Sequence, residues 1–474
     1  MTLPAKFVER VLRDLGGTEG AALCAALDAE PPVSVRLNPA KTGADTLPAG
    51  LDAGLPVPEA AGLPALAIAG RVPWSRDGRY LAVRPSFTLD PDFHAGAYYV
   101  QEASSQFVGH LLAAVRTEGA RILDLCAAPG GKTTLYASLA GPDGLVVANE
   151  IDRRRASVLA DNVRKWGTGN VAVTTCEPRA LGDFEAWFDV VAVDAPCSGE
   201  GMFRKDPDAR GEWSEGNVKQ CAARQDEILR EAWRALRPGG TLVYSTCTFN
   251  RDEDEGALER MAAWAGDEIA ESEETAVEDA WGIVCGRVGA FRTFRFYPHR
   301  TCGEGFFAAV ARKSFDAGGR VRAPKARRTV FAAVDRKTAG ELARWVRNPG
   351  GMRFAAVADT CYAWYAAQAD AVRTLSEALP VIYSGVALGQ VFKGVLKPDP
   401  ALAFFDGLNR GALPAAELDD EETLRFLRRQ DIAAGGLAEG MNLVCSRGRA
   451  LGFAKRIGAR VNNLYPNSLR IIKQ

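Results

Sequence analysis

The sequence has few histidines, no paired-cysteine motif and no long apolar run, and each lack excludes a class of protein. Only three residues are histidine, and none has the partner spacing of a metal ligand, so neither histidine-centred catalysis nor a metal site is expected. The ten cysteines are scattered without a C-x-x-C pair, which argues against a zinc site or a disulfide framework and favours a reducing cytoplasm. No run of about 18 apolar residues and no signal-peptide core is present, so a membrane span is not expected.

Charge is almost balanced overall, but it is unevenly distributed along the chain. The net charge is −1, yet residues 252–279 hold twelve Asp and Glu against one Arg. Residues 312–347 hold eleven Lys and Arg against three acids, and residues 441–474 hold seven Lys and Arg with no acid. Basic regions of this kind either follow a phosphate backbone or form ordinary solvated surface, and composition leaves both interpretations open.

The most informative stretch is Arg121 to Thr134, which reads R-I-L-D-L-C-A-A-P-G-G-K-T-T. A short apolar run ends at a turn of small residues, and the first turns of a helix follow. Strand, small-residue turn and helix form the opening unit of a doubly wound α/β sheet. The small residues allow the backbone to approach a ligand at the helix N-terminus, where free N–H groups point outward.

The sequence of this turn does not match the usual phosphate-binding motifs. A phosphate loop needs a glycine where Cys126 stands, and the dinucleotide pattern G-x-G-x-x-G is absent. Glu150 ends the next apparent strand, where a carboxylate can accept hydrogen bonds from both ribose hydroxyls of a nucleoside. A nucleoside that carries no pyrophosphate, bound by a loop that is not a phosphate loop, indicates S-adenosylmethionine as the ligand. The alternative is a generic α/β turn with a solvated Glu150.

The regions around this turn differ in pattern, and the length of 474 residues predicts two to four domains. Candidate strands of the α/β core are 121–126, 145–151, 171–176, 190–195 and 241–247, with helices at 132–140, 153–166 and 217–236. Strands separated by helices pair in parallel, whereas two later strands at 290–297 and 305–312 predict an antiparallel hairpin. Residues 1–94 precede the core as a separate α+β module. Residues 314–328 read as a linker, 329–380 as a mixed, mostly helical module and 381–474 as a β-rich end.

Two cysteines stand where apparent strands leave the sheet. Cys197 lies in D-A-P-C-S-G after one strand, and Cys247 lies in S-T-C-T after another. If these strands are neighbours, they lie about 4.7–4.9 Å apart, and their carboxyl ends open on the same crevice as the 126–132 turn. Two thiols and Asp194 would then face the nucleoside. Taken singly, each cysteine could instead be a small buried apolar residue, which is the interpretation kept for the other eight.

Paired thiols beside a sulfonium methyl donor suit methylation of a pyrimidine at C5. C5 is a poor nucleophile, but a thiolate that adds to C6 turns the ring into an enamine whose C5 can attack the methyl group. Asp194, bonded to N3 or to the 4-amino group, would favour this charge build-up and select cytosine. The C5 proton must then leave and the thiol must be eliminated, with the second cysteine assisting. The residues alone do not rank Cys197 and Cys247 in these two roles.

Several motifs together carry a family resemblance. They are D-L-C-A-A-P-G-G-K-T-T from Asp124, D-A-P-C-S-G from Asp194 and S-T-C-T from Ser245, supported by Gln225, L-R-P-G-G at 236–240 and G-E-G-F-F at 303–307. In these motifs the chain resembles the Sun family of RNA 5-methylcytosine methyltransferases, and most closely the bacterial RsmF-type 16S rRNA methyltransferases. The resemblance covers residues 95–313.

This resemblance implies a Rossmann-like domain over residues 95–313 that uses S-adenosylmethionine. The residues implied to bind the cofactor are Cys126, Ala127, Ala128, Pro129, Gly130, Gly131, Lys132, Glu150, Glu177 and Asp194. Residues 126–132 would bind the methionine part, Glu150 the ribose and Glu177 the adenine, while Asp194 would contact cofactor or base. The resemblance also assigns Cys247 as the nucleophile and Cys197 as the residue that releases the product.

The flanking modules resemble RNA-binding parts of the same family. Residues 1–94, with V-R-L-N-P at 35–39, are similar to its RNA-recognition extension. Residues 381–474 are similar to the PUA-like end of RsmF-type enzymes, and residues 329–380 form an intermediate module. The implied substrate is 16S rRNA, naked or in an assembled 30S subunit, with the target base unstacked. No membrane or DNA partner is expected, and the protein is expected to be monomeric and cytoplasmic.

Other functions fit the sequence less well. A DNA cytosine-5 methyltransferase shares the chemistry, but its nucleophile lies on the Pro-Cys motif, and a second cysteine such as Cys247 is not expected there. A tRNA cytosine-5 methyltransferase differs only in its RNA, and the C-terminal module favours rRNA. A non-catalytic RNA-binding ribosome-assembly factor would have no use for Cys247, Cys197, Asp194 and Lys132 together.

Overall fold

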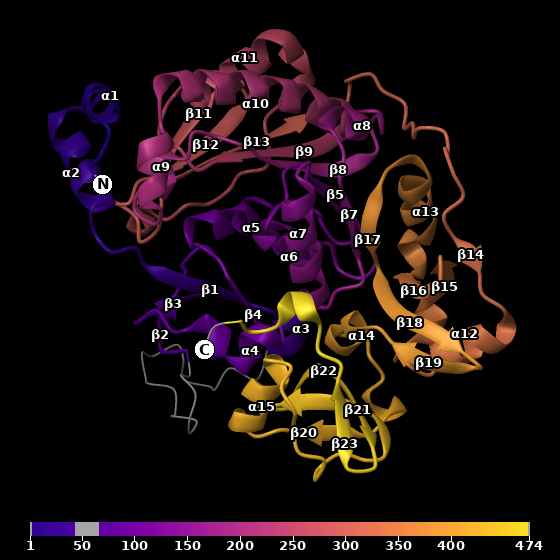
Figure 1. Cartoon of the computed structure of the whole chain (residues 1–474). Coiled ribbons are helices and arrows are strands. Elements are labelled where there is room, and N and C mark those ends of the chain that lie inside the picture. Colours follow the sequence, from indigo (N-terminus) through magenta and orange to yellow (C-terminus); the bar gives the residue numbers. More distant parts are fainter. Residues whose placement is uncertain (1, 43–65, 473–474) are drawn as a thin grey trace.

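The computed structural model describes residues 2–42 and 66–472, with a mixed sheet at its centre (Figure 1). The inner strands are parallel in the order β7-β6-β5-β8-β9, which is the doubly wound arrangement that the sequence predicts. These strands are β5 Arg121–Asp124, β6 Leu145–Asn149, β7 Val171–Thr174, β8 Phe188–Asp194 and β9 Leu236–Thr246. The helices around them are α6 Gly131–Ala140, α7 Arg153–Trp166, α8 Pro178–Gly182, α9 Pro207–Glu212, α10 Glu215–Ala235 and α11 Glu255–Ala265.

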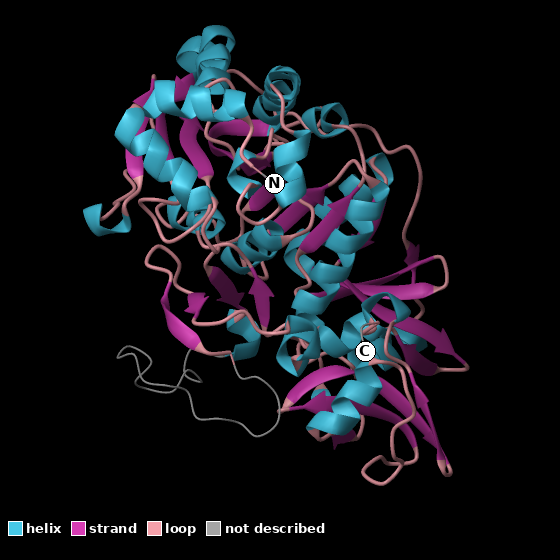
Figure 2. Cartoon of the chain, turned by 60° about the vertical axis from the view of Figure 1, so that its left-hand side comes forward, coloured by secondary structure: helices cyan, strands magenta, loops and turns pink. Residues whose placement is uncertain are grey.

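Helices cover both faces of this sheet (Figure 2), which explains why its strands read as nearly continuous apolar runs. On one face, Leu123 of β5 belongs to the same buried cluster as Leu229 of α10. On the other face, the adjacent Ile122 belongs to the same buried cluster as Leu159 of α7. Within the described ranges, no helix has the length and apolar character required to cross a membrane.

Antiparallel strands extend the parallel core at both edges. β12 Phe291–Phe296 and β13 Phe306–Lys313 form the predicted hairpin, and β13 also pairs with β9. β11 Val284–Val288 lies outside β12, and β10 Ile269–Ala270 pairs with β13. At the opposite edge, β17 Val381–Ser384 pairs with β7. Since β17 comes from the segment that the sequence groups with the β-rich end, the C-terminal part of the chain completes the central sheet.

The N-terminal module combines a helical pair with a small antiparallel sheet. α1 Ala5–Leu15 and α2 Gly17–Leu27 contact the central domain, because Phe7 shares a buried cluster with Phe203 and Phe249. The sheet has the order β2-β3-β1-β4. Its strands are β1 Val33–Leu37, β2 Ile68–Arg71, β3 Gly78–Leu81 and β4 Tyr98–Val100, and the short helices are α3 Pro39–Thr42, α4 Pro91–His94 and α5 Phe107–Leu111.

The segment 329–380, predicted to be a mixed, mostly helical module, contains two helices and also supplies strands to a second sheet of order β14-β15-β16-β18-β19. The strands of this sheet are β14 Ala332–Ala333, β15 Met352–Val357, β16 Thr360–Tyr365, β18 Val386–Phe392 and β19 Val395–Pro398. The helices of the segment are α12 Arg336–Ala343 and α13 Ala369–Ala378. The helical part of this prediction is found in α12 and α13, whereas the strands β14, β15 and β16 were not predicted. Residues of β16 such as Thr360, Tyr362 and Trp364 are of the β-branched and aromatic types that favour a strand.

The C-terminal sheet lies beside α4 of the N-terminal module (Figure 1), and polar side chains join the two parts. It has the order β20-β21-β22-β23. His94 Nδ1 of α4 lies 3.1 Å from Tyr465 Oη, and Arg449 Nη1 lies 2.8 Å from Asp92 Oδ1. The elements of this region are α14 Pro400–Phe404, β20 Ala415–Glu417, α15 Asp420–Leu427, β21 Gly440–Ser446, β22 Arg449–Ile457 and β23 Arg460–Asn463.

We expect His94 to make the protein less stable as the pH falls below about 6.5. Burial lowers the pKa of His94 to about 4, whereas in an unfolded chain it is about 6.5. The unfolded state therefore binds the proton first, so the contribution of neutral His94 is present above pH ~6.5 and is lost as the pH falls through about 4. Urea unfolding at pH 7.5 and 5.0 should show the stability advantage of the wild type over His94→Gln shrinking by about 2 kcal/mol. An advantage that does not change with pH would contradict this expectation.

Candidate active site

A cavity of about 970 Å³ opens at the carboxyl ends of the parallel strands. Open parallel sheets bind their ligands in this crevice, and the volume is in the usual range for small-molecule sites. Seven of the residues that the sequence singled out line it: Cys126, Ala128, Glu150, Glu177, Asp194, Cys197 and Cys247. The fold therefore gathers around one space side chains that are far apart in the sequence.

The loop 126–132 runs along this cavity and is held from behind. Gly130 has a φ of +111° at the N-cap of α6, and a Cβ there would come within 3.0 Å of the Leu159 side chain. Only glycine combines that backbone conformation with that close approach. Asn162 Nδ2 of α7 donates a hydrogen bond to the carbonyl oxygen of Pro129 at 2.9 Å. The loop is thus fixed on its outer side. Of its residues, Cys126 and Ala128 line the cavity, whereas Ala127, Pro129, Gly130, Gly131 and Lys132 do not.

Arg36 of the N-terminal module supports the same loop. Its Nη2 donates to the carbonyl oxygen of Gly131 at 3.1 Å and to Thr134 Oγ1 at 2.6 Å, and its Nε donates to Gln101 Oε1 at 2.7 Å. The guanidinium lies 4.5 Å from the ring centroid of Trp166. Burial lowers the pKa of Arg36 to about 10, so it remains charged at neutral pH. Through Arg36, strand β1 of the N-terminal module therefore holds the first turn of α6 in place.

Glu150 and Glu177 stand at two points on the cavity wall. Glu150 is only 4% exposed, with its Oε2 3.1 Å from Arg155 Nη1 and its Oε1 accepting the backbone N–H of Asp152 at 3.0 Å. Arg155 Nη2 also donates to the carbonyl oxygen of Ala128 at 3.0 Å, which ties the acid to the loop. Glu177 is exposed and immediately precedes α8. Glu150 is thus held in one orientation, whereas the side chain of Glu177 is exposed to solvent.

Lys132 and Asp194 form an ion pair beside the cysteines. Lys132 Nζ lies 2.8 Å from Asp194 Oδ2, and Ser245 Oγ donates to Asp194 Oδ1 at 2.8 Å. Burial disfavours the charged form of Lys132, but the carboxylates of Asp194 and Asp124 outweigh it, so the pKa of Lys132 is raised above its ordinary value. Lys132 therefore keeps its positive charge at the edge of the cavity.

Cys197 and Cys247 meet where β8 and β9 end. These strands are parallel neighbours with Asp194 opposite Ser245, so the residues just beyond them lie at the same edge of the sheet. The two Sγ atoms are 3.2 Å apart, and the backbone N–H of Cys247 donates to Cys197 Sγ at 3.4 Å. The hydrogen bond with Cys247 and burial raise the pKa of the Cys197 thiol well above its usual range. Cys197 is therefore a neutral thiol at physiological pH.

The chain matches three family models along its length. The model described as 16S rRNA methyltransferase RsmB/F matches residues 111–312, which contain the cavity and both cysteines. The N-terminal domain of 16S rRNA methyltransferase RsmF matches residues 3–103. The PUA domain of methyltransferase RsmF matches residues 414–471.

Curated relatives match almost the whole chain. Ribosomal RNA small subunit methyltransferase F of Shewanella loihica is 32% identical, covering 84% of this chain and 83% of its own length. The protein of the same name from Escherichia coli O127:H6 is 33% identical, with 84% of each chain covered. This chain belongs to the RsmB/F family of 16S rRNA methyltransferases. The resemblance expected from the sequence motifs is confirmed.

Solved structures agree with this family. A methyltransferase homolog from Pyrococcus horikoshii superimposes with a TM-score of 0.52 at 27% identity, over 65% of this chain and 94% of its own. NSun6 from Pyrococcus horikoshii, at 21% identity, shares the fold with a TM-score of 0.52 over 65% of this chain and 98% of its own. The predicted Rossmann-like fold is confirmed, and the enzyme is an S-adenosylmethionine-dependent methyltransferase. The cavity fits this cofactor, because it joins a buried carboxylate to a small-residue loop at a helix N-terminus.

A buried carboxylate that sequence reasoning missed holds the Cys197 loop of this RsmB/F enzyme. Glu253 is fully buried, and its Oε2 accepts the backbone N–H of Ser198 at 3.0 Å and Gln225 Nε2 at 2.9 Å. Its Oε1 accepts Asn250 Nδ2 at 2.7 Å. Gln225 also donates to the carbonyl oxygen of Pro196 at 3.0 Å. The turn that carries Cys197 is therefore bonded on both sides of the cysteine.

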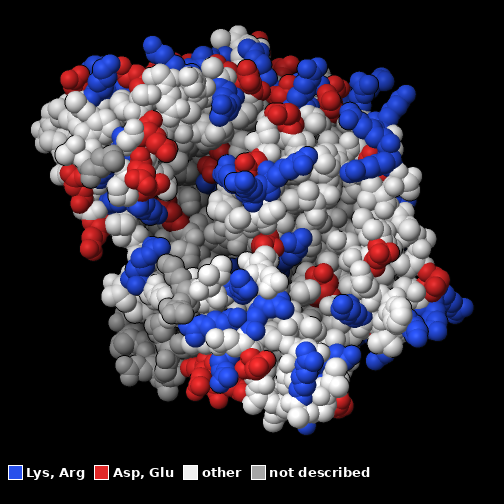
Figure 3. Space-filling view, in the orientation of Figure 1, with Lys and Arg blue, Asp and Glu red and all other residues white. Residues whose placement is uncertain are grey.

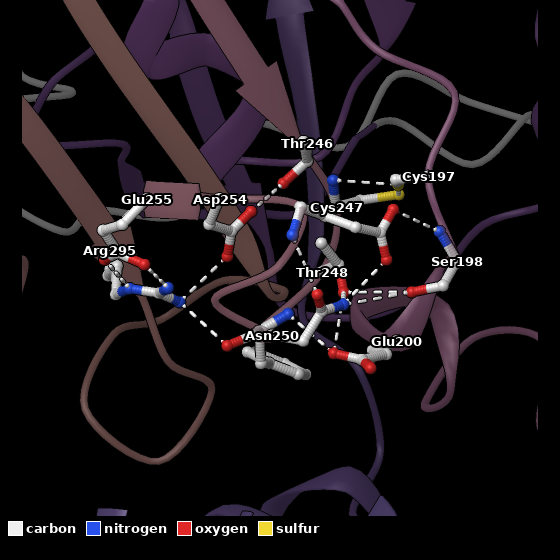
Figure 4. A network of polar contacts seen from close by, with 12 residues as sticks. Cys197, Ser198, Glu200, Thr246, Cys247, Thr248, Asn250, Asp254, Glu255 and Arg295 are labelled. Atoms are coloured by element: carbon white, nitrogen blue, oxygen red, sulfur yellow. Dashed lines mark hydrogen bonds and ion pairs between the residues drawn. The ribbon is translucent and has the colours of Figure 1, made fainter. Parts of the chain in front are cut away.

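A second buried carboxylate, Glu200, holds the Cys247 loop (Figure 4). Its Oε2 accepts Thr248 Oγ1 at 2.7 Å and the backbone N–H of Phe249 at 2.9 Å. Its Oε1 accepts Trp213 Nε1 at 2.9 Å and also bonds the guanidinium of Arg10. Because Arg10 belongs to α1, the N-terminal module reaches the network that supports the turns of Cys197 and Cys247.

The signal for these supporting residues is weak in the sequence. Glu253 and Asp254 lie in an acidic run that reads as solvated surface, yet both are fully buried. Asp254 Oδ1 accepts Thr246 Oγ1 at 2.6 Å, and its Oδ2 lies 3.0 Å from Arg295 Nη1 (Figure 4). The one usable hint is that both acids come only six and seven residues after Cys247 in the sequence.

We expect Glu253→Gln to lower both stability and activity. The amide has one acceptor oxygen instead of two, so at least one of the three donors around it loses its partner, at a cost of about 1–3 kcal/mol. Urea unfolding should register that loss, and single-turnover methylation should slow because the Cys197 turn is no longer fixed. Glu259→Gln is the matched control, since Glu259 is an exposed acid a few residues further on. Equal effects of the two substitutions would contradict a positioning role for Glu253.

Proposed function

We propose that this enzyme methylates C5 of a cytosine in 16S rRNA, with Cys247 as the nucleophile and Cys197 as the residue that releases the product. The observation that carries this proposal is the pair of thiols, 3.2 Å apart and both on the cavity wall. Relatives that match most of the chain are named ribosomal RNA small subunit methyltransferase F, which supports rRNA as the substrate.

Cys247 begins the reaction as a thiolate, after its proton has passed to solvent. The sulfur adds to C6 of the cytosine, and C5 gains the electron pair of the C5–C6 double bond. A bound S-adenosylmethionine would supply an electrophilic methyl group to this pair, with the methyl–sulfur bond breaking as the C5–methyl bond forms and S-adenosylhomocysteine leaving. Asp194 contacts the base at N3 or the 4-amino group, and Lys132 supplies positive charge beside it.

Cys197 then resolves the covalent adduct. Its neutral thiol lies next to the sulfur that must leave. Cys197 gives its proton to the departing sulfur of Cys247 and takes the C5 proton in return, while the C5–H electron pair restores the C5–C6 double bond. Both cysteines end as thiols, and the proton that Cys247 first lost to solvent is the net proton released.

The remaining predicted residues divide between cofactor and RNA. The loop 126–132 holds the methionine part of the cofactor, Glu150 accepts hydrogen bonds from the ribose hydroxyls, and Glu177 contacts the adenine. The N-terminal module and the PUA-like C-terminal module hold the RNA on either side of the target base. The enzyme works as a monomer in the cytoplasm, where its rRNA substrate is found.

Substitution of each cysteine should separate the two roles. Cys247→Ala should abolish methyl transfer from labelled S-adenosylmethionine to 16S rRNA, because no thiolate adds to C6. Cys197→Ala should still add to C6 but fail to release, so a covalent protein–RNA adduct should appear as a shifted band on a denaturing gel. Cys285→Ala, which changes an exposed cysteine outside the cavity, should behave as the wild type. An adduct formed by Cys247→Ala and not by Cys197→Ala would reverse the assignment.

Mapping of the modified base should identify the RNA. In a strain that lacks this enzyme, we expect bisulfite sequencing to show at least one cytosine of 16S rRNA losing its resistance to conversion, while tRNA cytosines keep theirs. Restoring the wild-type gene should restore the mark, and restoring the Cys247→Ala gene should not. Loss of marks in tRNA with 16S rRNA unchanged would show that the enzyme is a tRNA methyltransferase.

A further inference from the structure

The tip of the β18–β19 hairpin exposes two large apolar side chains far from the cavity. Phe392 and Val395 are the last paired residues of the hairpin, and they are 72% and 65% exposed. The base of the hairpin is firmly held, because Leu388 and Leu396 are buried and the backbone N–H of Leu396 donates to Glu341 Oε1 at 3.1 Å. The tip is thus a rigid projection that presents an aromatic ring to solvent.

The turn at this tip holds a lysine in a left-handed backbone conformation, which is unfavourable for residues other than glycine. Lys393 and Gly394 have φ values of +51° and +82°, and the left-handed region costs a residue other than glycine roughly 1 kcal/mol. The β21–β22 turn has the same form at Arg447, with a φ of +51°. There the arginine forms ion pairs with acids of the same chain. Arg447 Nη1 lies 3.5 Å from Asp90 Oδ1, whereas no ion pair joins Lys393 to any acid in the described part of the chain.

Further cations surround the tip, and the nearby acids are already engaged. Lys397 of β19 and Lys337 of α12 are exposed, and a Cβ at Gly394 would come within 3.2 Å of Lys337 Cε. Of the acids on α12, Asp335 caps the helix by accepting the N–H of Thr338 at 2.7 Å, and Glu341 binds β19. Figure 3 shows blue side chains gathered at the lower right, over α12 and the hairpin tip. The tip therefore presents positive charge around an exposed ring, and Lys393 Nζ itself lies 5.5 Å from the centroid of the Phe392 ring.

We propose that this tip is an RNA contact in which the Phe392 ring stacks on an unpaired base while Lys337, Lys393 and Lys397 contact the flanking phosphates. An aromatic ring within a group of cations is the combination that single-stranded nucleic acids bind, through stacking and backbone neutralisation. A protein partner with an apolar surface would leave the three lysines uncompensated. The inference rests on the proposed function, since it assigns a second contact to the same RNA substrate.

Binding of in vitro transcribed 16S rRNA, measured without turnover, tests this contact. Phe392→Ala should weaken binding about 5- to 100-fold, the range expected for one lost base–aromatic stack. The triple variant of Lys337, Lys393 and Lys397 to Ala should reduce the slope of log affinity against log salt by about 2. At saturating rRNA, kcat should stay that of the wild type while KM for rRNA rises. Phe315→Ala, at another phenylalanine that is 67% exposed and lies beside an arginine, is the matched control and should bind as the wild type.

The outcomes separate this inference from the proposed function. Wild-type affinity for naked 16S rRNA in the Phe392→Ala protein would overturn the contact, as would an equal loss in Phe315→Ala. Unchanged binding to naked rRNA with weaker binding to 30S subunits would identify a ribosomal protein as the partner, and would also overturn it. Failure of the wild type to methylate rRNA would count against the proposed function and would leave the binding comparison intact.

Discussion

The parallel register of β8 and β9 sets Asp194 opposite Ser245, and this pairing brings both cysteine turns to one edge of the sheet. A shift of one residue would turn every side chain of a strand to the other face, so the buried core on both faces keeps the register fixed. Register alone does not orient the two thiols, since each cysteine lies beyond its strand. The carboxylates of Glu253 and Glu200 complete the task by bonding the turns that follow.

The parts of this site that the sequence could predict are those with a local pattern. The strand ends at Asp194 and Thr246, the small-residue loop and the acid at Glu150 all follow from short motifs. The supporting residues could not be predicted in the same way. Glu253 belongs to an acidic run that is typical of solvated surface, and its burial depends on the packing of α10 and α11, which no local pattern reveals.

The same limit explains the strands that were not predicted. The strands of 352–365 contain β-branched and aromatic residues, but the sheet that they form depends on pairing with β18 further along the chain. The position of β17 against β7 is likewise a tertiary fact, because nothing in V-I-Y-S says which sheet the strand joins. Long-range pairing, rather than composition, decides both outcomes.

The N-terminal module supports the active site from outside, since none of its described residues lines the cavity. Arg36 supports the loop at the start of α6, and Arg10 reaches Glu200 below the Cys247 turn. These two arginines approach from separate elements, β1 and α1, and both are largely buried. A displacement of this module would therefore disturb the cofactor loop and the cysteine turns together.

The pairing of β17 with β7 has a consequence for how the molecule can be divided. β17 supplies the outermost hydrogen-bonded strand on that side, and Gly385, with a φ of +61°, then turns the chain into the next sheet. A shortened protein ending near residue 313 would leave the backbone N–H and C=O groups of β7 open to solvent, next to a strand whose side chains are all buried. Open sheet edges of this kind can pair with strands of other molecules, and β17 protects the edge of β7 from such pairing.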